Sequence, residues 1–482
     1  MAFDPGNAAD ALRLIPTLPG VFALRGEHVS SEPYLTRAAD LRRRITRLLN
    51  PPELTADGVQ PSKRLNLRER VRSIEYTVTG SEFESLLILY EAASAIFGHV
   101  EARRRLRMNT PFFLRLTLDH AHPRVYSTNR LSQRSLTRTY GPFPSRTAAD
   151  RYCDAVLDLF KLRRCYEDLE VSPQHPGCAY GEMKKCMAPC NMSCTAEEYA
   201  AEAHVVESFF NSHGASMLEQ IRADRERASA EMEFEQAAAL HERYAKVKSA
   251  AALADELVVP VASLRAILVQ KAATQTAERE VQEASVFLLQ GGRLFGPERL
   301  STLGVRAVKE QTSVGSSLFA QPLMIQAVPL VAENGGSPMD SPEVRAEGVL
   351  ERLSLRSQDP QAAEAGVFAP GNAGEGAQRP GRGDLTGVSD HLSLLRRWYY
   401  RPEKQRAGEI FFPNADGSWP VRRILRGAAR MSLGEPKPMA ETQRDAAADA
   451  KVRILHEGRE GIERVVPLVK KRSARKGSEG NA

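Results

Sequence analysis

The chain has 482 residues, too many for a single hydrophobic core, and its length suggests about three domains. Its 42% of hydrophobic residues suffices for globular folding, while no apolar run approaches the roughly 20 residues of a membrane-spanning helix. The net charge of +6 favours nucleic acid or another anionic partner, although 60 acidic residues beside 66 basic ones also fit an ordinary solvated surface. The N-terminus lacks the basic and apolar segments of a signal peptide, so the expected compartment is the cytoplasm, where thiols stay reduced.

The first 105 or so residues predict a small α/β domain. Short β-rich runs at 20–24 and 72–80 alternate with amphipathic helical runs at 39–49 and 81–97. The first of these helices is expected to bury one apolar face, made of Leu41, Ile45, Leu48 and Leu49, and to expose Arg42, Arg43 and Arg47.

The later segments differ in composition. Residues 106–200 combine a basic stretch with all six cysteines, and residues 201–255 are nearly free of Gly and Pro and strongly helical. A β-rich segment follows, with a hairpin expected to turn at Gly291-Gly292. Residues 356–390 are low-complexity and predict a flexible linker, and residues 470–482 predict a disordered basic tail.

Four of the cysteines have the spacing of a metal site, C-x12-C-x7-C-x3-C: Cys165, Cys178, Cys186 and Cys190. Soft sulfur ligands select zinc or an iron–sulfur cluster, although this spacing is not the paired C-x2-C of zinc ribbons. Cys153 lies on a helical stretch and is expected to be a buried structural thiol, and Cys194 is an alternate ligand. The competing interpretation is that all six are small core residues.

The cysteine region resembles the central region of the UvrC excinuclease family. The run YGPFPSRTAADRYCDAVLDLFKLRRC is followed by HPGCAYGEMKKCMAPCNMSCTAEEY, which is similar to the family pattern PC-x7-C-x-APC. This resemblance implies a 4Fe–4S cluster on Cys165, Cys178, Cys186 and Cys190. It extends over about residues 12–413, most clearly over 110–250, and corresponds to the N-terminal half of the family.

Residues 218–253 predict a helical hairpin with Leu240, Tyr244 and Val247 on one face. Intramolecular packing or a short antiparallel coiled coil would explain that pattern. The segment EMEFEQAAALHERYAKVK, however, resembles the UVR motif. In the UvrC family this hairpin pairs with a similar hairpin of UvrB, and the residues that match the motif are Glu233, Phe234, Glu235, Ala237, Ala238 and Leu240.

The N-terminal run LPGVFALRGEHVSSEPYLTRAADLRRRITRLL resembles the GIY-YIG nuclease core. Relatives cut phosphodiesters with one divalent metal, such as Mg²⁺, a water nucleophile and a tyrosine that assists proton removal. That chemistry needs a carboxylate for the metal, a base near the water and a cation for the phosphate. The resemblance implies that Tyr34 is the catalytic base and that Arg44 is the phosphate-stabilising cation.

The rest of the nuclease motif is degenerate. The positions of the GIY tyrosine, the YIG glycine, the following lysine and the second tyrosine hold Phe22, Thr36, Arg37 and Leu48. The metal-binding glutamate of the family falls at Leu89. Glu91 lies about 200° round a helix from that position, and Glu84 matches a family glutamate that is not the ligand. We therefore expect impaired or absent incision.

The predicted fold class is α+β multidomain. Its expected parts are a degenerate GIY-YIG nuclease-like domain at 12–105, a Cys-rich iron–sulfur region at 106–200, a UVR helical hairpin at 201–255, a β-containing UvrC-like middle region at 256–413 and a basic tail at 414–482. A ribonuclease H-like nuclease and helix-hairpin-helix motifs, which full-length relatives carry, do not fit in the last residues.

Three functions are compatible with these features. The first is a DNA-binding protein of nucleotide excision repair that pairs with UvrB and cuts little or not at all. The second is an active single-domain GIY-YIG endonuclease dependent on Mg²⁺, which Glu91 reaching the metal would favour. The third is an iron–sulfur adaptor or regulatory protein, which an absence of DNA affinity would favour. Enzymatic activity is left open by the sequence.

Overall fold

The computed structural model describes residues 1–28, 31–50, 65–166, 169–273, 282–305, 341–358, 385–402, 405–434, 451–453 and 465–467. Residues 1–433 form one compact unit, and residues 434–482 form another. Within the second unit, β12 (Lys451–Arg453) pairs with β13 (Val465–Pro467) in antiparallel fashion. No helix in the described part of the chain has the length and apolar character needed to cross a bilayer.

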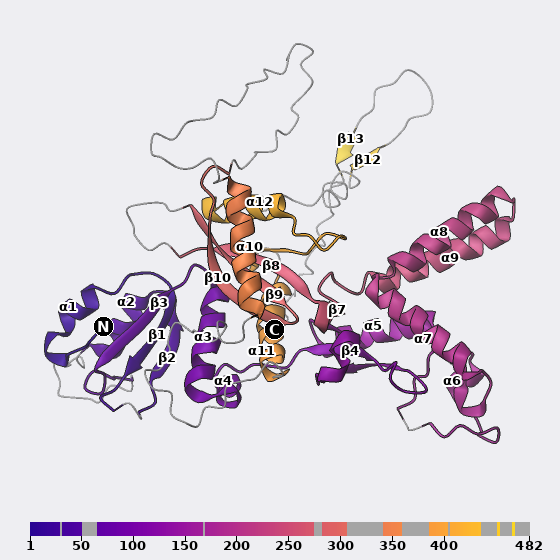
Figure 1. Cartoon of the computed structure of the whole chain (residues 1–482), viewed down its shortest axis with the longest axis horizontal. Helices are drawn as coiled ribbons and strands as arrows, with labels where there is room; N and C mark the ends of the chain where they lie inside the picture. The colour runs from indigo at the N-terminus through magenta and orange to yellow at the C-terminus, as the bar shows by residue number, and fades with distance from the viewer. Residues whose placement is uncertain are drawn as a thin grey trace, which may run out of the picture. The chain divides into compact units, whose positions relative to one another are not determined.

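The N-terminal domain is a three-stranded antiparallel sheet in the order β2-β1-β3, made of β1 (Gly20–Arg25), β2 (Tyr34–Ala38) and β3 (Ser73–Val78). Helices α1 (Ala8–Arg13) and α2 (Leu41–Leu49) pack on one face (Figure 1). Helix α2 buries the four apolar residues predicted for its inner face, and Asp40 caps its start by accepting from the N–H of Arg43 at 2.9 Å.

Helix α3 (Glu82–Phe97) covers the opposite face of this sheet and is buried on two sides. On one side Ile88, Leu89 and Ala92 pack with Val21 and Ala23 of β1. On its other side α3 contributes to the core of the third sheet, which is described below. The residues that do so are Phe83, Leu86, Leu87 and Tyr90. The short helix α4 (His99–Arg105) follows directly.

A second sheet of four strands, in the order β5-β4-β6-β7, forms the middle of the chain. Its strands are β4 (Phe112–Leu116), β5 (Val125–Thr128), β6 (Thr139–Phe143) and β7 (Val259–Pro260). Helices α5 (Arg146–Leu159) and α7 (Ala196–Asn211) contribute to the same core, which is rich in aromatic rings. Short turns of helix lie at η1 (Pro5–Asn7), η2 (Gln133–Arg138), α6 (Ala179–Glu182), η3 (Pro189–Asn191) and η4 (Val261–Ser263).

The helical hairpin predicted at 218–253 consists of α8 (Ala215–Ala230) and α9 (Phe234–Ala251), which run side by side in Figure 1. Its base joins the aromatic core through buried Ile221, Val247 and Ala250. The hairpin is therefore anchored to the middle domain at one end only, as its apolar pattern requires.

The third sheet has the order β10-β9-β8-β11, with β8 (Arg265–Lys271), β9 (Glu283–Gln290), β10 (Arg293–Ser301) and β11 (Glu409–Phe411). The hairpin predicted at Gly291-Gly292 is confirmed. Both glycines have positive φ, +57° and +79°, which a two-residue turn between twisted strands requires. Helix α11 (Leu385–Tyr399) packs on the α3 side of this sheet, and α10 (Pro342–Gln358) and α12 (Val421–Leu433) pack on the other.

Two predicted boundaries differ from the structure. The basic tail was expected from residue 414, but α12 buries Ile424, Leu425 and Ala428 against the third sheet, so that domain extends to Leu433. The ends of α10 and α11 lie inside the linker expected at 356–390. Residues 359–384 of that linker and the tail at 470–482 lie outside the described residues.

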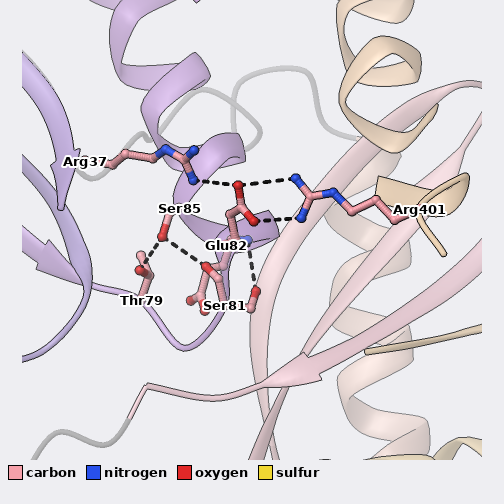
Figure 2. Close-up of polar contacts among 7 residues, drawn as sticks. Arg37, Thr79, Ser81, Glu82, Ser85 and Arg401 are labelled. Atoms are coloured by element: carbon pink, nitrogen blue, oxygen red, sulfur yellow. Dashed lines mark hydrogen bonds and ion pairs between the residues drawn. The ribbon is translucent and has the colours of Figure 1, made fainter. Parts of the chain in front are cut away.

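Polar contacts at the N-terminal end of α3 join the first and third sheets. In Figure 2, Arg37 and Arg401 approach the carboxylate of Glu82 from opposite sides, with N–O distances of 3.0 Å to Arg37 and 2.6 and 3.2 Å to Arg401. Hydrogen bonds from Arg401 and Arg37 lower the pKa of Glu82 from 4.5 to about 2, although partial burial opposes them. Because the folded-state pKa is lowered, these contacts stabilise the fold at neutral pH, and that stabilisation is lost as the pH falls toward 2.

A second polar group lies in the same interface. The carboxylate of Asp390 on α11 is fully buried and accepts a hydrogen bond of 2.9 Å from the hydroxyl of Tyr90 on α3. The guanidinium of Arg103 on α4 lies 3.2 Å from the other carboxylate oxygen. A buried carboxylate is tolerated when it is paired in this way.

The buried position of Asp390 predicts that Asp390→Asn lowers the free energy of unfolding by about 3 kcal/mol, because Arg103 loses its charged partner inside the protein. Urea unfolding followed by circular dichroism measures the change. The control is Glu101→Gln, which removes an exposed carboxylate paired with Arg104 and Arg105 and should leave the midpoint unchanged. Equal effects of the two substitutions on the free energy of unfolding would contradict the stabilising role of the Asp390–Arg103 pair.

Candidate functional site

The structure brings together the predicted catalytic pair of the N-terminal domain. Tyr34 begins β2 and Arg44 lies on α2, and the guanidinium of Arg44 donates a hydrogen bond of 3.3 Å to the Tyr34 hydroxyl. The ring of Phe22 lies beside Tyr34, with 6.2 Å between the ring centroids. Thr36 pairs with Phe22 in the sheet register and therefore shares this face, and Leu48 is buried in the core beneath it.

Arg37, the remaining cation of the motif, lies on the opposite face of the sheet. Its partner in the register is Val21, whose side chain packs under α3. Its guanidinium is held by Glu82. Arg37 therefore contributes to the contact between the first and third sheets and does not lie beside Tyr34.

Leu89, at the position where the sequence predicts the metal-binding glutamate of the family, is a core residue. It is 6% exposed and packs with Val21, Ala23 and Ile88, on the face of the sheet opposite to Phe22 and Tyr34. A carboxylate at this position would meet apolar side chains on every packed side.

Neither nearby glutamate is suited to replace it. Burial raises the pKa of Glu91 to about 8, so this carboxyl ionises less readily than an ordinary glutamate. Glu84 is buried, accepts a hydrogen bond of 2.8 Å from the backbone N–H of Gly80, and pairs with Arg299 at 3.5 Å. Tyr34 and Arg44, the predicted catalytic pair, thus lie together, whereas Leu89, at the predicted ligand position, packs on the opposite face of the sheet.

The cysteine segment between α5 and α7 folds back on itself in tight turns. Three non-glycine residues between its cysteines have left-handed backbone conformations, with φ of +56°, +52° and +60°: Lys184, Ala188 and Met192. Cys186 and Cys190 are buried, whereas Cys165 and Cys178 are half-buried. Such reversals turn the segment back toward itself and allow distant cysteines to approach one another.

The four predicted ligands lie near one another. The pKa of the Cys186 thiol is raised to about 11, first by burial and then by the neighbouring sulfurs of Cys178, Cys165 and Cys190. The backbone N–H of Ala188 donates to the Cys186 sulfur at 3.3 Å, and the guanidinium of Arg163 donates to the Cys165 sulfur at 3.8 Å. Cysteine sulfurs that accept N–H hydrogen bonds are typical of the ligands of iron–sulfur and zinc sites.

The four sulfurs are not drawn together as ligands of a single ion. Among the described residues, no three His, Cys, Asp or Glu side chains are arranged to hold a metal ion. A tetrahedral zinc, with Zn–S bonds of about 2.3 Å, would require sulfur–sulfur separations of about 4 Å.

The two remaining cysteines differ from this group. Cys153 lies in the aromatic core, and its thiol donates to the carbonyl of Val125 at 3.8 Å, as expected of a structural thiol. Cys194 is half-buried, and burial, followed by the charges of Glu198 and Cys190, raises its pKa. Cys194 therefore lies close to the group without being embedded in it.

The turn of the α8–α9 hairpin is exposed. Met232, which has φ of +61°, is 75% exposed, and Phe234, at the start of α9, is 70% exposed. The other predicted partner-binding residues are exposed or half-exposed: Glu233, Glu235, Ala237, Ala238 and Leu240. The face that carries the motif is therefore accessible in this chain.

An arrangement that was not predicted from the sequence lies beside the cysteines. The guanidinium of Arg124 lies over the rings of both Tyr126 and Tyr166, at 5.0 and 5.1 Å from their centroids. The sequence signal was the close spacing of arginines and tyrosines in the runs PRVY and RRCY. Only the fold shows that these two runs contribute to a single stack.

Comparisons with known proteins find similarity over the central part of the chain. The family model for the UvrC/Cho excinuclease middle domain matches residues 112–209, which include strands β4, β5 and β6 of the second sheet, the cysteine segment and most of α7. The chain is similar to three proteins named UvrABC system protein C. The protein from Idiomarina loihiensis is 25% identical, and the match covers 49% of this chain and 37% of the relative. The protein from Desulforudis audaxviator is 26% identical, with 68% of this chain and 52% of the relative covered. The protein from Streptomyces griseus is 29% identical, with 63% of this chain and 41% of the relative covered.

The chain thus spans between about a third and a half of the length of these curated relatives. No solved structure gives a significant match to the chain.

The location of Leu89 predicts that Leu89→Glu lowers the free energy of unfolding by more than about 3 kcal/mol and does not create a metal site, because the new carboxylate enters the apolar contact with Val21 and Ala23. Leu89→Met, which conserves volume, should lower it by less than about 1.5 kcal/mol. Denaturant unfolding with and without Mg²⁺ measures both. A Leu89→Glu protein that is as stable as the original and is stabilised by Mg²⁺ would contradict this assignment.

Proposed function

Because the chain belongs to the UvrC family, we propose that it acts in nucleotide excision repair as a DNA-binding protein that pairs with a UvrB-like partner and has little or no incision activity of its own. The observation that carries this proposal is the exposed turn of the α8–α9 hairpin. The hairpin follows the matched middle domain directly in the chain, and Phe234 offers an unburied aromatic ring at its turn. Aromatic residues of this kind are typical anchors of protein interfaces.

Loss of incision is supported by the geometry of the Tyr34 face. A nuclease of this type needs a carboxylate-bound cation to stabilise the charge on the phosphate. Leu89 lies in the core on the far side of the sheet, and burial raises the pKa of Glu91 to about 8. These two facts also weigh against the alternative of an active single-domain endonuclease.

DNA binding does not depend on that missing metal site. The chain has 66 basic residues, and several arginines on α2 and α4 are exposed, among them Arg42, Arg43 and Arg104. Binding through spread arginine contacts releases condensed counterions, so the affinity should fall steeply as salt increases. Absence of this affinity would favour the iron–sulfur adaptor alternative.

In this proposal Cys165, Cys178, Cys186 and Cys190 would hold a 4Fe–4S cluster, with zinc as the alternative. When bound, such a cluster would tie the turns of the cysteine segment to the aromatic core beside it. The N–H groups of Ala188 and Arg163 that donate to two of the sulfurs would stabilise these ligands in their anionic form.

The exposed position of Phe234 predicts that Phe234→Ala weakens binding of the C-terminal hairpin of UvrB by about 2 kcal/mol or more, without loss of folding. Isothermal titration calorimetry with the whole chain measures the affinity. The control is Val100→Ala, which truncates an even more exposed apolar side chain on α4 and should leave binding unchanged. Binding by the unaltered chain that is insensitive to Phe234→Ala would show that the hairpin is not the contact.

The cysteine assignment predicts about four irons per chain after anaerobic purification, measured as iron and acid-labile sulfide. Cys178→Ser should lose the metal and much of the soluble protein, because a ligand of the closed site is removed. Cys194→Ser should keep the iron. One zinc per chain without iron would overturn the cluster and leave a structural zinc site.

A further inference from the structure

A fixed stack of cations and aromatic rings lies beside the cysteine segment. The guanidinium of Arg124 lies over Tyr126 at 5.0 Å and over Tyr166 at 5.1 Å. It also donates a hydrogen bond of 3.2 Å to the backbone carbonyl of Cys165, which immediately precedes Tyr166. The three side chains are thus held in place by contacts that do not require a ligand.

The face of the second sheet that carries Tyr126 extends this stack. Arg115 on β4 is directly opposite Tyr126 on β5 in the register, so the two side chains project from the same face. Their strand neighbours Leu114, Leu116 and Val125 project from the other face into the aromatic core. Arg115 is half-buried, and its Nε has no hydrogen-bond partner within the described protein. Arg115, Tyr126, Arg124 and Tyr166 therefore form a strip in which cations and rings alternate.

The end of this strip is open to solvent. Tyr166 is 72% exposed, although a tyrosine ring would gain by covering its apolar faces. A second pair of the same kind lies on the cysteine segment, where Arg164 lies 5.7 Å from the ring centroid of Tyr180, which is 40% exposed. Exposed rings next to fixed guanidinium groups suit a ligand that has both flat apolar faces and negative charge.

We propose that the strip formed by Arg115, Tyr126, Arg124 and Tyr166 binds unpaired nucleotides of a nucleic acid strand. Tyr166 stacks on an exposed base, and Arg115 and Arg124 neutralise the phosphates that flank it. Bases inside a duplex are stacked on one another and present no free face to Tyr166, so the strip distinguishes unpaired from paired strands. The inference deepens the proposed DNA-binding role and rests on it.

Fluorescence anisotropy of labelled oligonucleotides with the whole chain tests this inference. The probes are a single strand of about 20 thymidines and a duplex of the same length. Tyr166→Ala should weaken single-strand binding about ten-fold and leave duplex binding within about two-fold, because one stacked base is lost. Tyr166→Phe should restore single-strand affinity, because it keeps the ring. The control Val100→Ala should change neither affinity.

The other outcomes overturn specific parts of this proposal. Unchanged single-strand affinity in Tyr166→Ala, with binding by the original chain intact, overturns the strip and leaves the proposed function standing. An equal loss for both probes overturns base stacking in favour of a general contact. Binding of neither probe by the original chain overturns the DNA-binding role itself, and the strip with it.

Discussion

The burial of α3 on two sides is the constraint on which the rest of the structure depends. One side of this helix covers the N-terminal sheet, and the other side completes the core of the third sheet together with α11. The N-terminal end of the helix also connects the two domains, since Glu82 pairs with Arg37 of the first sheet and with Arg401, which follows α11 (Figure 2). The helix therefore has almost no surface left for chemistry, and its side chains are selected for packing.

This constraint accounts for the division of roles along the chain. The Tyr34–Arg44 pair lies on the face of the sheet that α3 does not cover, whereas Leu89, at the position predicted for the metal ligand, is part of the core. Among the described residues, exposed large side chains include those at the turn of the α8–α9 hairpin and the tyrosines beside the cysteine segment. Accessible aromatic rings next to cations suit binding.

Local patterns predicted local structure well. The period of Leu41, Ile45, Leu48 and Leu49 identified the inner face of α2, and the pair Gly291-Gly292 identified a hairpin, because both depend on neighbours in the chain. Contacts between distant segments could not be predicted from such local patterns. Glu82 pairs with Arg401 across 319 positions of the chain, and neither local sequence indicates its partner. Helix α12 was assigned to a basic tail because its several arginines suggested an exposed segment, although its apolar residues form a buried face.

The central claim is that this chain binds DNA and a UvrB-like partner without cutting. An incision assay tests it most directly, with UvrA, UvrB and Mg²⁺ on a duplex that carries one defined lesion. We expect the chain to bind the assembly, and any incision to be at least about 10³-fold slower than that of an intact GIY-YIG relative, because several kcal/mol of metal-dependent stabilisation is lost. A robust cut that is abolished by Tyr34→Phe would contradict this claim.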